Sequence, residues 1–202
     1  MAAVEAIAPR AAGVETRRRF QRYLDLFLHW NRTHRMTTLD SPLAVVRKLF
    51  ADSLLFLPLL PSRRPLVVVD IGAGAGIPGL PLRLADPQIR LTLIESRRKR
   101  VSFLRAARRE LGLDDVSVEE GRAEHLVEER ASLHEAFDAA VARAVSPADT
   151  LREVALKYLK TGGVFIASAG PKSTPRDGAQ VVHVPIPWGR TMRSFRKITK
   201  ES

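Results

Sequence analysis

One short segment, from Leu66 to Gly79, constrains the fold of this chain more than any other. Its first part, LVVVD at 66–70, is apolar and of strand length, which is typical of a strand buried on both faces of a parallel sheet. Glycines follow at once, and glycine permits the positive φ angles and the close approach of backbone to ligand that such a turn needs. A buried strand followed by a glycine turn predicts an α/β sheet that binds a ligand at its carboxyl edge.

The rest of the chain alternates between strand and helix, which implies right-handed crossovers and a mostly parallel sheet. Two final strands are expected to form an antiparallel hairpin at the sheet edge, where Pro185 and Pro187 are tolerated. We therefore predict an α/β fold with a seven-stranded sheet flanked by helices. Beyond the first strand, the predicted strands are 90–96, 116–120, 137–145, 163–168, 180–186 and 194–200, and the predicted helices between them include 99–111 and 149–159.

The segment before the first strand is predicted to be a helical extension. From Thr16 onward, apolar residues recur at helical spacing, and burial against the rest of the fold explains such a stripe better than a dedicated RNA-binding helix does. A second helix is predicted from Pro42 to Leu57, with Ser41 as its N-cap. We expect an extension at 1–60 and a ligand-binding domain at 61–202, packed as one compact unit.

The glycines alone do not identify the ligand. Gly74, Gly76 and Gly79 match the dinucleotide fingerprint, and Glu95 follows where a ribose-binding acid belongs. The strand ends in Asp70 before the glycines, however, and the fingerprint would begin too late, which disfavours a dehydrogenase. A methyltransferase uses the same edge differently, with the turn around the methionine and ribose and with Glu95 accepting hydrogen bonds from the ribose hydroxyls. Alternatively, Glu95 only caps a strand beside the basic run 97–100.

Composition narrows the function further. The chain has 33 Lys and Arg residues against 22 Asp and Glu, a net charge of +11 that favours a polyanionic partner such as RNA. It has no cysteine, which excludes disulfides, thiolate metal sites and cysteine nucleophiles. His29 and His34 lack partners at metal-ligand spacing, so no metal is expected. With no apolar stretch of bilayer length and no secretory leader, we expect a cytoplasmic protein.

Taken in order, the motifs resemble a known family, the bacterial small-subunit (16S) rRNA guanine-N7 methyltransferases, also called the glucose-inhibited division protein B family. The resemblance is dense from Leu66 to Gly163 and weaker in the N-terminal helices, where Asp52-Ser53 stands at the family's Asp-Ser pair. The motifs that carry it are DIGAGAGIPGLPL, LIESRRKRVSFLRAARRELGL, GRAEHL, FDAAVARAV and LKTGG.

The resemblance implies a Rossmann-like class I methyltransferase fold and transfer of a methyl group from S-adenosylmethionine to N7 of a guanine in small-subunit ribosomal RNA. Guanine N7 carries a free lone pair, so no catalytic base is needed and none is proposed. Arg143 is implied as a cofactor contact that could also face the incoming nucleotide. Together with Gly74 and Glu95 from the glycine-turn argument, the candidate cofactor-binding residues are Gly72, Gly74, Ile77, Glu95, Ala123, Glu124 and Arg143.

Three departures from the family pattern fall on its substrate side. Arg35-Met36 stands where the family has Asn-Leu, Lys48-Leu49 where it has Arg-His, and Ala169-Gly170 where it has Lys-Gly, with Lys172 further on. We expect a monomer acting on ribosomal RNA or the small subunit. The alternatives are a methyltransferase of the same fold with another substrate, such as a small molecule, and a non-catalytic RNA-binding module, with a dehydrogenase third.

Overall fold

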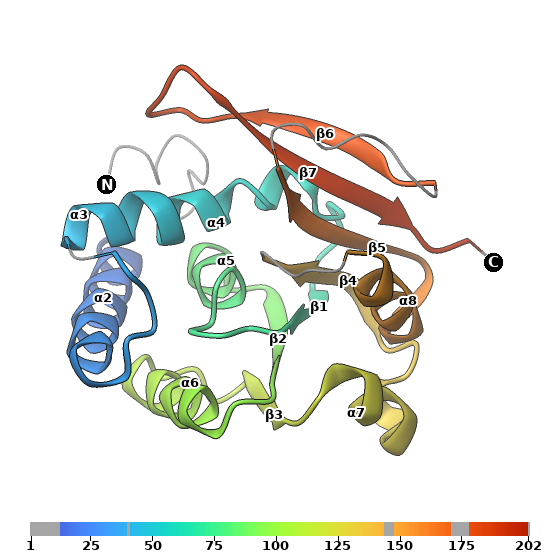
Figure 1. Ribbon diagram of the computed structural model, residues 1–202, viewed down its shortest axis with the longest axis horizontal. Helices are drawn as coiled ribbons and strands as arrows, with labels where there is room; N and C mark the ends of the chain where they lie inside the picture. Colours follow the sequence, from blue (N-terminus) through green and yellow to red (C-terminus); the bar gives the residue numbers. More distant parts are fainter. Residues whose placement is uncertain (1–12, 40, 144–147, 171–177, 202) are drawn as a thin grey trace.

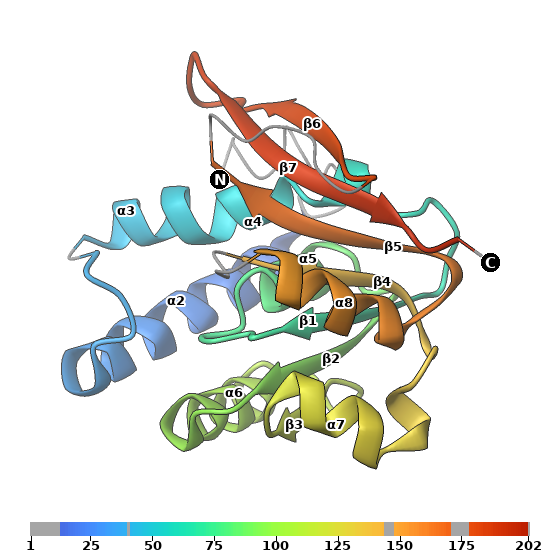
Figure 2. The ribbon, with the colours of Figure 1, turned by 45° about the vertical axis from the view of Figure 1, so that its right-hand side comes forward.

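The computed structural model describes residues 13–39, 41–143, 148–170 and 178–201 (Figures 1 and 2). Its centre is a seven-stranded sheet with strand order β3-β2-β1-β4-β5-β7-β6. The strands are β1 (Leu66–Ile71), β2 (Ile89–Glu95), β3 (Ser117–Glu120), β4 (Phe137–Ala142), β5 (Leu159–Ala169), β6 (Gln180–Pro185) and β7 (Met192–Thr199).

Strand pairing confirms the predicted topology. Strand β1 lies between β2 and β4 and is parallel to both, with Val68 opposite Leu91 on one side and Ala139 on the other. Strands β3 and β5 extend the parallel part outward. The last two strands form an antiparallel hairpin whose β7 strand also runs antiparallel to β5. The sheet is therefore mostly parallel, and its antiparallel hairpin forms one edge, as predicted.

Helices cover both faces of this sheet, because successive residues of each strand point to opposite sides. Val68 joins a core on one face, with α2 (Val14–His34), α5 (Gly79–Ala85) and α6 (Arg98–Glu110). Val69 joins a second core on the other face, with α7 (Ala123–Glu129) and α8 (Ala148–Tyr158). Both valines are fully buried, which explains the unbroken apolar run of the first strand. Figure 2 shows α7 and α8 together at the front of the sheet.

The N-terminal segment packs into the first of these cores. Tyr23 and Phe27 of α2 lie against Phe50 and against Phe103 of α6. Ring centroids of 4.5 Å and an interplanar angle of 6° show that Tyr23 and Phe50 are stacked. Burial of the apolar stripe is therefore confirmed. The boundary at residue 60 stays a prediction, since residues on both sides of it share one core.

The second predicted helix is interrupted. It consists of α3 (Pro42–Val45), a π-helical segment η2 (Val46–Ala51), α4 (Asp52–Leu54) and a separate 3₁₀ turn η3 (Leu57–Leu59). Its start is as predicted, since Ser41 Oγ accepts a hydrogen bond from the Ala44 amide at 3.1 Å. The π segment was not predicted, because one residue of extra winding leaves the apolar periodicity almost unchanged over a single turn.

Other element boundaries also differ from prediction. Strand β4 ends at Ala142, one residue before the described range stops, so positions 144 and 145 of the predicted strand lie outside the described residues, and β5 begins at Leu159 rather than at Gly163. The ladder between β4 and β5 shifts register after Phe137, which lets β5 start before Gly162 and Gly163. Two adjacent glycines look like a turn in sequence, so this irregular first part of β5 was missed. None of the described helices combines the length and apolar character needed to cross a membrane.

Candidate functional site

The predicted site residues come from four different connections but lie at one edge of the sheet. Gly72, Gly74 and Ile77 follow β1, and Glu95 ends β2. Ala123 and Glu124 begin α7 after β3, and Arg143 follows β4 directly. Since β1 to β4 are parallel, all seven residues lie at the carboxyl ends of the strands, where open α/β sheets bind their ligands.

The glycines of the turn divide into two groups. Gly76 and Gly79 are required by packing: an added Cβ would lie 2.4 Å from a Leu80 methyl carbon at Gly76 and 2.7 Å from Asp70 Oδ2 at Gly79. Gly72 and Gly74 have positive φ angles of 71° and 60°, yet a Cβ would meet nothing within 4 Å at Gly72 and nothing nearer than 3.7 Å at Gly74. Among the described residues, the backbone at Gly72 therefore faces open space, and a side chain at Gly74 would meet only ordinary van der Waals contacts, so packing does not require either glycine and close approach of a ligand would.

Glu95 lies directly beside this turn. Its side chain is nearly buried, with the residue 4% exposed, and its two oxygens accept hydrogen bonds from the Gly74 amide at 2.9 Å and the Arg97 amide at 2.8 Å. The Arg100 guanidinium is 3.7 Å away. Each carboxylate oxygen keeps a second acceptor position. Glu95 therefore holds the glycine turn against the end of β2 and can still accept hydrogen bonds from a diol.

Asp70 is a second buried carboxylate at the same edge. Its Oδ2 accepts a hydrogen bond from the Gly79 amide at 2.8 Å, whereas its fully buried Oδ1 has no partner among the described residues. Burial raises the pKa of Asp70 to about 7, the Gly79 hydrogen bond opposes this rise, and the nearby Glu95 carboxylate adds to it. An unpartnered buried oxygen needs an explanation, and a cationic or N–H-bearing ligand group would supply one.

Sequence reasoning did not include Asp70 among the site residues. Its position before the glycines served as an argument against a dehydrogenase, and it begins the DIGAGAGIPGLPL motif, but it was given no role of its own. The signal was nevertheless present, because an acid that ends an otherwise apolar buried strand is costly unless a partner compensates it.

Arg143 is held by the N-terminal segment. Its guanidinium pairs with Asp52 Oδ2 at 3.0 Å and donates to the carbonyl oxygens of Lys48 and Leu49. Arg193 of β7 lies 3.4 Å from the same Asp52 oxygen. Because the contacts at 48 and 49 use backbone carbonyls, the departure from the family pattern at Lys48-Leu49 leaves them intact. Asp52, whose pKa is raised by burial against the opposing effect of Arg143 and Arg193, supplies the side-chain partner of Arg143 among the described residues.

Helix α2 also contacts the glycine turn. The hydroxyl of Tyr23, fully buried in that helix, donates a hydrogen bond to the carbonyl of Ala75, between Gly74 and Gly76. Tyr23 belongs to the apolar stripe of this helix, and its ring stacks on Phe50.

The three remaining predicted residues make mainly structural contacts. Ile77 is buried in the core, and its amide donates to the Ala73 carbonyl at 3.0 Å. The carbonyl of Ala123 accepts from the Tyr158 hydroxyl at 2.7 Å. Glu124 pairs with Arg122 at 2.8 Å; its own backbone amide, and then Arg122, lower its pKa. A bond from the Gly121 amide to the Glu95 carbonyl, 3.1 Å long, places this α7 turn beside the end of β2.

The other two positions at which the sequence departs from the family pattern also lie near this edge of the sheet. Arg35 ends α2, and Ala169 ends β5 opposite Ser194 of β7. Lys172 lies outside the described residues. Within the described ranges, no three His, Asp or Glu side chains gather closely enough to hold a metal ion.

Comparison with known proteins shows which family the chain resembles in sequence. Residues 16–176 match the family model described as rRNA small subunit methyltransferase G. The protein of that name from Alkaliphilus metalliredigens is 40% identical over 150 residues, which cover 74% of this chain and 62% of the relative. Its namesake from Caldanaerobacter subterraneus subsp. tengcongensis is 41% identical over 152 residues, covering 75% and 63%. The matched part thus spans less than two thirds of these relatives.

Solved structures share the fold at low sequence identity. An S-adenosylmethionine-dependent methyltransferase from Aquifex aeolicus matches with a TM-score of 0.57 and 15% identity, covering 82% of this chain and 96% of that one. A mutant of MtNAS in complex with S-adenosylmethionine matches with a TM-score of 0.60 and 19% identity, covering 89% and 75%. Together with the strand order, these similarities confirm the Rossmann-like methyltransferase fold.

Proposed function

The chain belongs to the rRNA small subunit methyltransferase G family, and from this premise we propose that it transfers a methyl group from S-adenosylmethionine to N7 of a guanine in small-subunit ribosomal RNA. The observation that carries the proposal is the pair of buried carboxylates, Asp70 and Glu95, at the ends of adjacent strands on either side of an open glycine turn. A dinucleotide site needs one acid for a ribose, and this edge has two.

The two carboxylates match the polar groups of the cofactor. S-adenosylmethionine has a ribose diol and a cationic amino group, and it supplies the reaction with an electrophilic methyl group on sulfur. We assign the diol to Glu95, which keeps acceptor capacity, and the amino group to Asp70, whose Oδ1 is unpartnered. The open backbone at Gly72, with no tight contact at Gly74, lets the ligand approach closely. We also assign Ile77, Ala123 and Glu124 to the cofactor site, since they lie at the same edge of the sheet as the glycine turn and Glu95.

The chemistry places few demands on the protein. Guanine N7 has a lone pair that is free at neutral pH, so no residue has to remove a proton. The protein has to align N7 with the methyl group and the sulfur and to exclude water. Arg143, at the end of the strand next to β1, is suited to contact the base at O6 or a phosphate. Asp52 and the carbonyls of residues 48 and 49 hold its guanidinium in place, and the N–H groups that these three partners leave free can donate to the substrate.

The choice of RNA over a small molecule is supported by charge. A net charge of +11 suits a partner that carries many phosphates, and it supplies no advantage for a neutral small substrate. We further propose that the protein acts as a monomer in the cytoplasm, where ribosomal RNA is assembled into subunits.

Cofactor binding tests the first half of this proposal. We expect calorimetry to show micromolar binding of S-adenosylmethionine and S-adenosylhomocysteine and no measurable binding of NAD. Comparable or tighter binding of NAD would overturn the class assignment and favour the dehydrogenase.

Glu95→Gln sharpens the test. Both oxygens of Glu95 accept from backbone amides, so a glutamine must turn its NH₂ group toward one of those donors. We expect cofactor affinity to fall by about 1–3 kcal/mol, the range for losing a hydrogen bond to a charged group. Circular dichroism checks that the variant is folded, and an unchanged dissociation constant would remove Glu95 from the site.

A further inference from the structure

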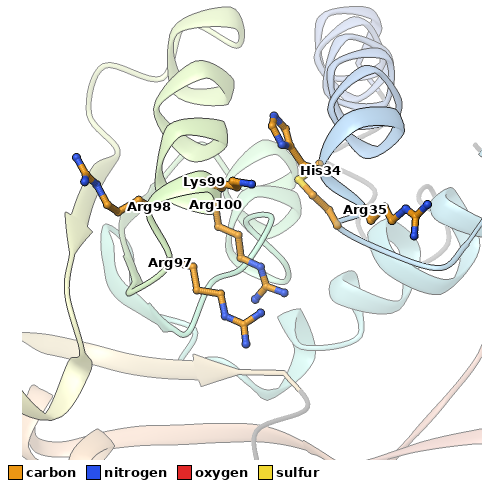
Figure 3. Close-up of a pocket in the computed structure, with 7 residues that line it drawn as sticks. His34, Arg35, Arg97, Arg98, Lys99 and Arg100 are labelled. Atoms are coloured by element: carbon orange, nitrogen blue, oxygen red, sulfur yellow. The ribbon is translucent and has the colours of Figure 1, made fainter.

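A basic pocket lies between the end of α2 and the start of α6, next to Glu95. It has a volume of about 290 Å³ and is lined by His34, Arg35 and Met36 from one helix end and by residues 97–100 from the other. Figure 3 shows Arg97 and Arg100 extending side by side from the start of α6, while Lys99 points toward the end of α2. Four arginines and one lysine line this pocket, and none of its described lining residues carries a carboxylate.

Most of this charge is uncompensated. Arg98 approaches Glu120 only to 3.7 Å and is 93% exposed, and Arg100 approaches Glu95 to the same distance. For the side chains of Arg35, Arg97 and Lys99, no hydrogen bond or ion pair is found within the described part of the chain. Like charges that converge without partners repel one another, and an anion would relieve that repulsion.

The arrangement is also locally unfavourable for the helix. The N-terminus of a helix carries a partial positive charge, which favours acidic residues in the first turn. Helix α6 has 13 residues, no acidic residue in its first turn and no side-chain cap, and its first three residues are Arg98, Lys99 and Arg100. The Arg97 and Arg100 amides are already bonded, to Glu95 and to the Arg97 carbonyl, so the basic side chains that line the pocket supply most of its attraction for an anion, and the helix N-terminus adds to it.

On the other side of the pocket, the backbone conformation of Arg35 is also unfavourable. Arg35 has a φ angle of 45°, in the left-handed region that arginine rarely adopts and that glycine or asparagine would occupy with less strain. The side chain at this position therefore has to contribute something that outweighs the strain. Two independent departures from the locally preferred residue, one at each helix end, add positive charge to a single pocket.

We propose that this pocket binds backbone phosphates of the RNA strand that presents the target nucleotide. The inference rests on the proposed function, and it names an interaction that the function requires. The cofactor does not account for the pocket, since its one carboxylate is outweighed by the positive charge of its sulfonium and amino groups. A nucleic acid strand has one phosphate per nucleotide, and the pocket adjoins Glu95, so a bound phosphate would lie beside the methyl donor.

The test compares two double variants of one helix. Arg97→Gln/Lys99→Gln removes two charges from the pocket, and Arg108→Gln/Arg109→Gln removes two from the last turn of α6 as a charge-matched control. Arg35→Asn tests the opposite wall. Fluorescence anisotropy measures binding of a labelled single-stranded oligoribonucleotide at several salt concentrations, without cofactor. Thermal unfolding of each protein and calorimetry with S-adenosylmethionine complete the comparison.

We expect the pocket variants to gain thermal stability, or to keep it, while RNA affinity falls about tenfold or more near 0.1 M salt. The slope of log affinity against log salt should fall by about 1.4 for the double variant, or about 0.7 for each phosphate that is no longer neutralised. The control should lose less than threefold in affinity. A residue that only supports the fold would not gain stability while losing RNA.

Three outcomes would overturn the inference: RNA binding unchanged in the pocket variants, an equal loss in the control, or a loss of S-adenosylmethionine affinity as large as the loss of RNA affinity. The last outcome would assign the pocket to the cofactor. If the unmodified protein binds no S-adenosylmethionine and methylates no RNA, the proposed function fails, whereas the oligoribonucleotide comparison still decides whether the pocket binds phosphate.

Discussion

Asp70 and Glu95 lie at the ends of neighbouring strands, and their surroundings differ. Glu95 accepts a backbone hydrogen bond on each oxygen, whereas Asp70 accepts one from the described part of the chain and is completely buried. Glu95 from β2 and the Tyr23 hydroxyl from α2 are the titratable groups that interact with Asp70. The unpartnered oxygen is therefore stable as a charged group only when a ligand supplies a donor. Removing the charge of Asp70 should stabilise the free protein and weaken its binding of the cofactor.

Asp70→Asn should separate these effects. With a pKa of about 7 in the folded protein against 3.8 when unfolded, Asp70 contributes stability that is fully present below pH 3.8 and lost as pH rises through 7. The loss amounts to about 4 kcal/mol at most. Without cofactor, the variant should therefore be more stable than the unmodified protein at pH 8 and similar at pH 4, as measured by urea unfolding.

The same substitution should weaken S-adenosylmethionine binding at pH 8 by about tenfold or more, because the neutral amide no longer faces a cation with a charge. In the unmodified protein, affinity should rise with pH through about 7, as Asp70 ionises. A variant that loses stability at pH 8 and keeps its affinity would contradict both roles.

Arg143 and Asp52 make a second prediction at this scale. Arg143→Ala should lower the methylation rate at saturating cofactor more than tenfold, or roughly 1.4 kcal/mol in barrier, with a smaller loss of cofactor affinity. Arg143→Lys should rescue little, since the fork is lost. Asp52→Asn should lower the methylation rate through its effect on Arg143. The double variant Asp52→Asn/Arg143→Ala should therefore methylate no more slowly than the slower of the two single variants. Additive losses of methylation rate, or an effect on cofactor affinity alone, would contradict a positioning role for Asp52.

At the scale of elements, helix α2 packs against the glycine turn and holds it by a hydrogen bond. Its Tyr23 hydroxyl reaches the Ala75 carbonyl, and its ring stacks on Phe50 of the π segment. Tyr23→Phe should retain the stacking and lose one hydrogen bond. We expect unfolding to become easier by about 0.5–1.5 kcal/mol and cofactor affinity to fall severalfold, because the turn loses its tether.

Phe27→Leu, in the same helix and the same core, is the control for that experiment. It should destabilise the protein by a comparable or larger amount and leave cofactor affinity nearly unchanged, since the Phe27 ring packs against Phe50 and Phe103 and cannot form a hydrogen bond to the turn. Equal losses of affinity in the two variants would show that general loosening of the core, rather than the Tyr23 hydrogen bond, lowers binding.

The elements also show what sequence reasoning can and cannot reach. Strands such as β1 were predictable because burial on both faces demands an unbroken apolar run. The π segment η2 was not predictable, and neither was the early start of β5, since both depend on packing and register with distant strands. For the site, the order of motifs placed all seven candidates at one edge. The partners of Arg143 and Tyr23 could not be foreseen, because they are 91 and 52 residues away in the chain.

For the whole molecule, the strand order, the buried carboxylates at the carboxyl edge of the sheet and the positive charge are all consistent with a methyltransferase that acts on RNA. The order β3-β2-β1-β4-β5-β7-β6 places the glycine turn at the centre of the parallel part, and the N-terminal segment packs beside that edge and binds Arg143. A non-catalytic RNA-binding module would need the charge but would have no use for Asp70 and Glu95 beside an open turn. A small-molecule methyltransferase would need the carboxylates but not the basic pocket.

The most direct test of this account identifies the methylated nucleoside. The protein is incubated with S-adenosylmethionine labelled in the methyl group and with small-subunit ribosomal RNA, free or assembled, from a strain that lacks the enzyme. The RNA is then digested to nucleosides and separated by chromatography. Label that co-elutes with 7-methylguanosine, and that is absent when Glu95→Gln replaces the unmodified protein at low cofactor concentration, is the predicted result. Label in any other nucleoside, or none in either form of the RNA, would contradict the account.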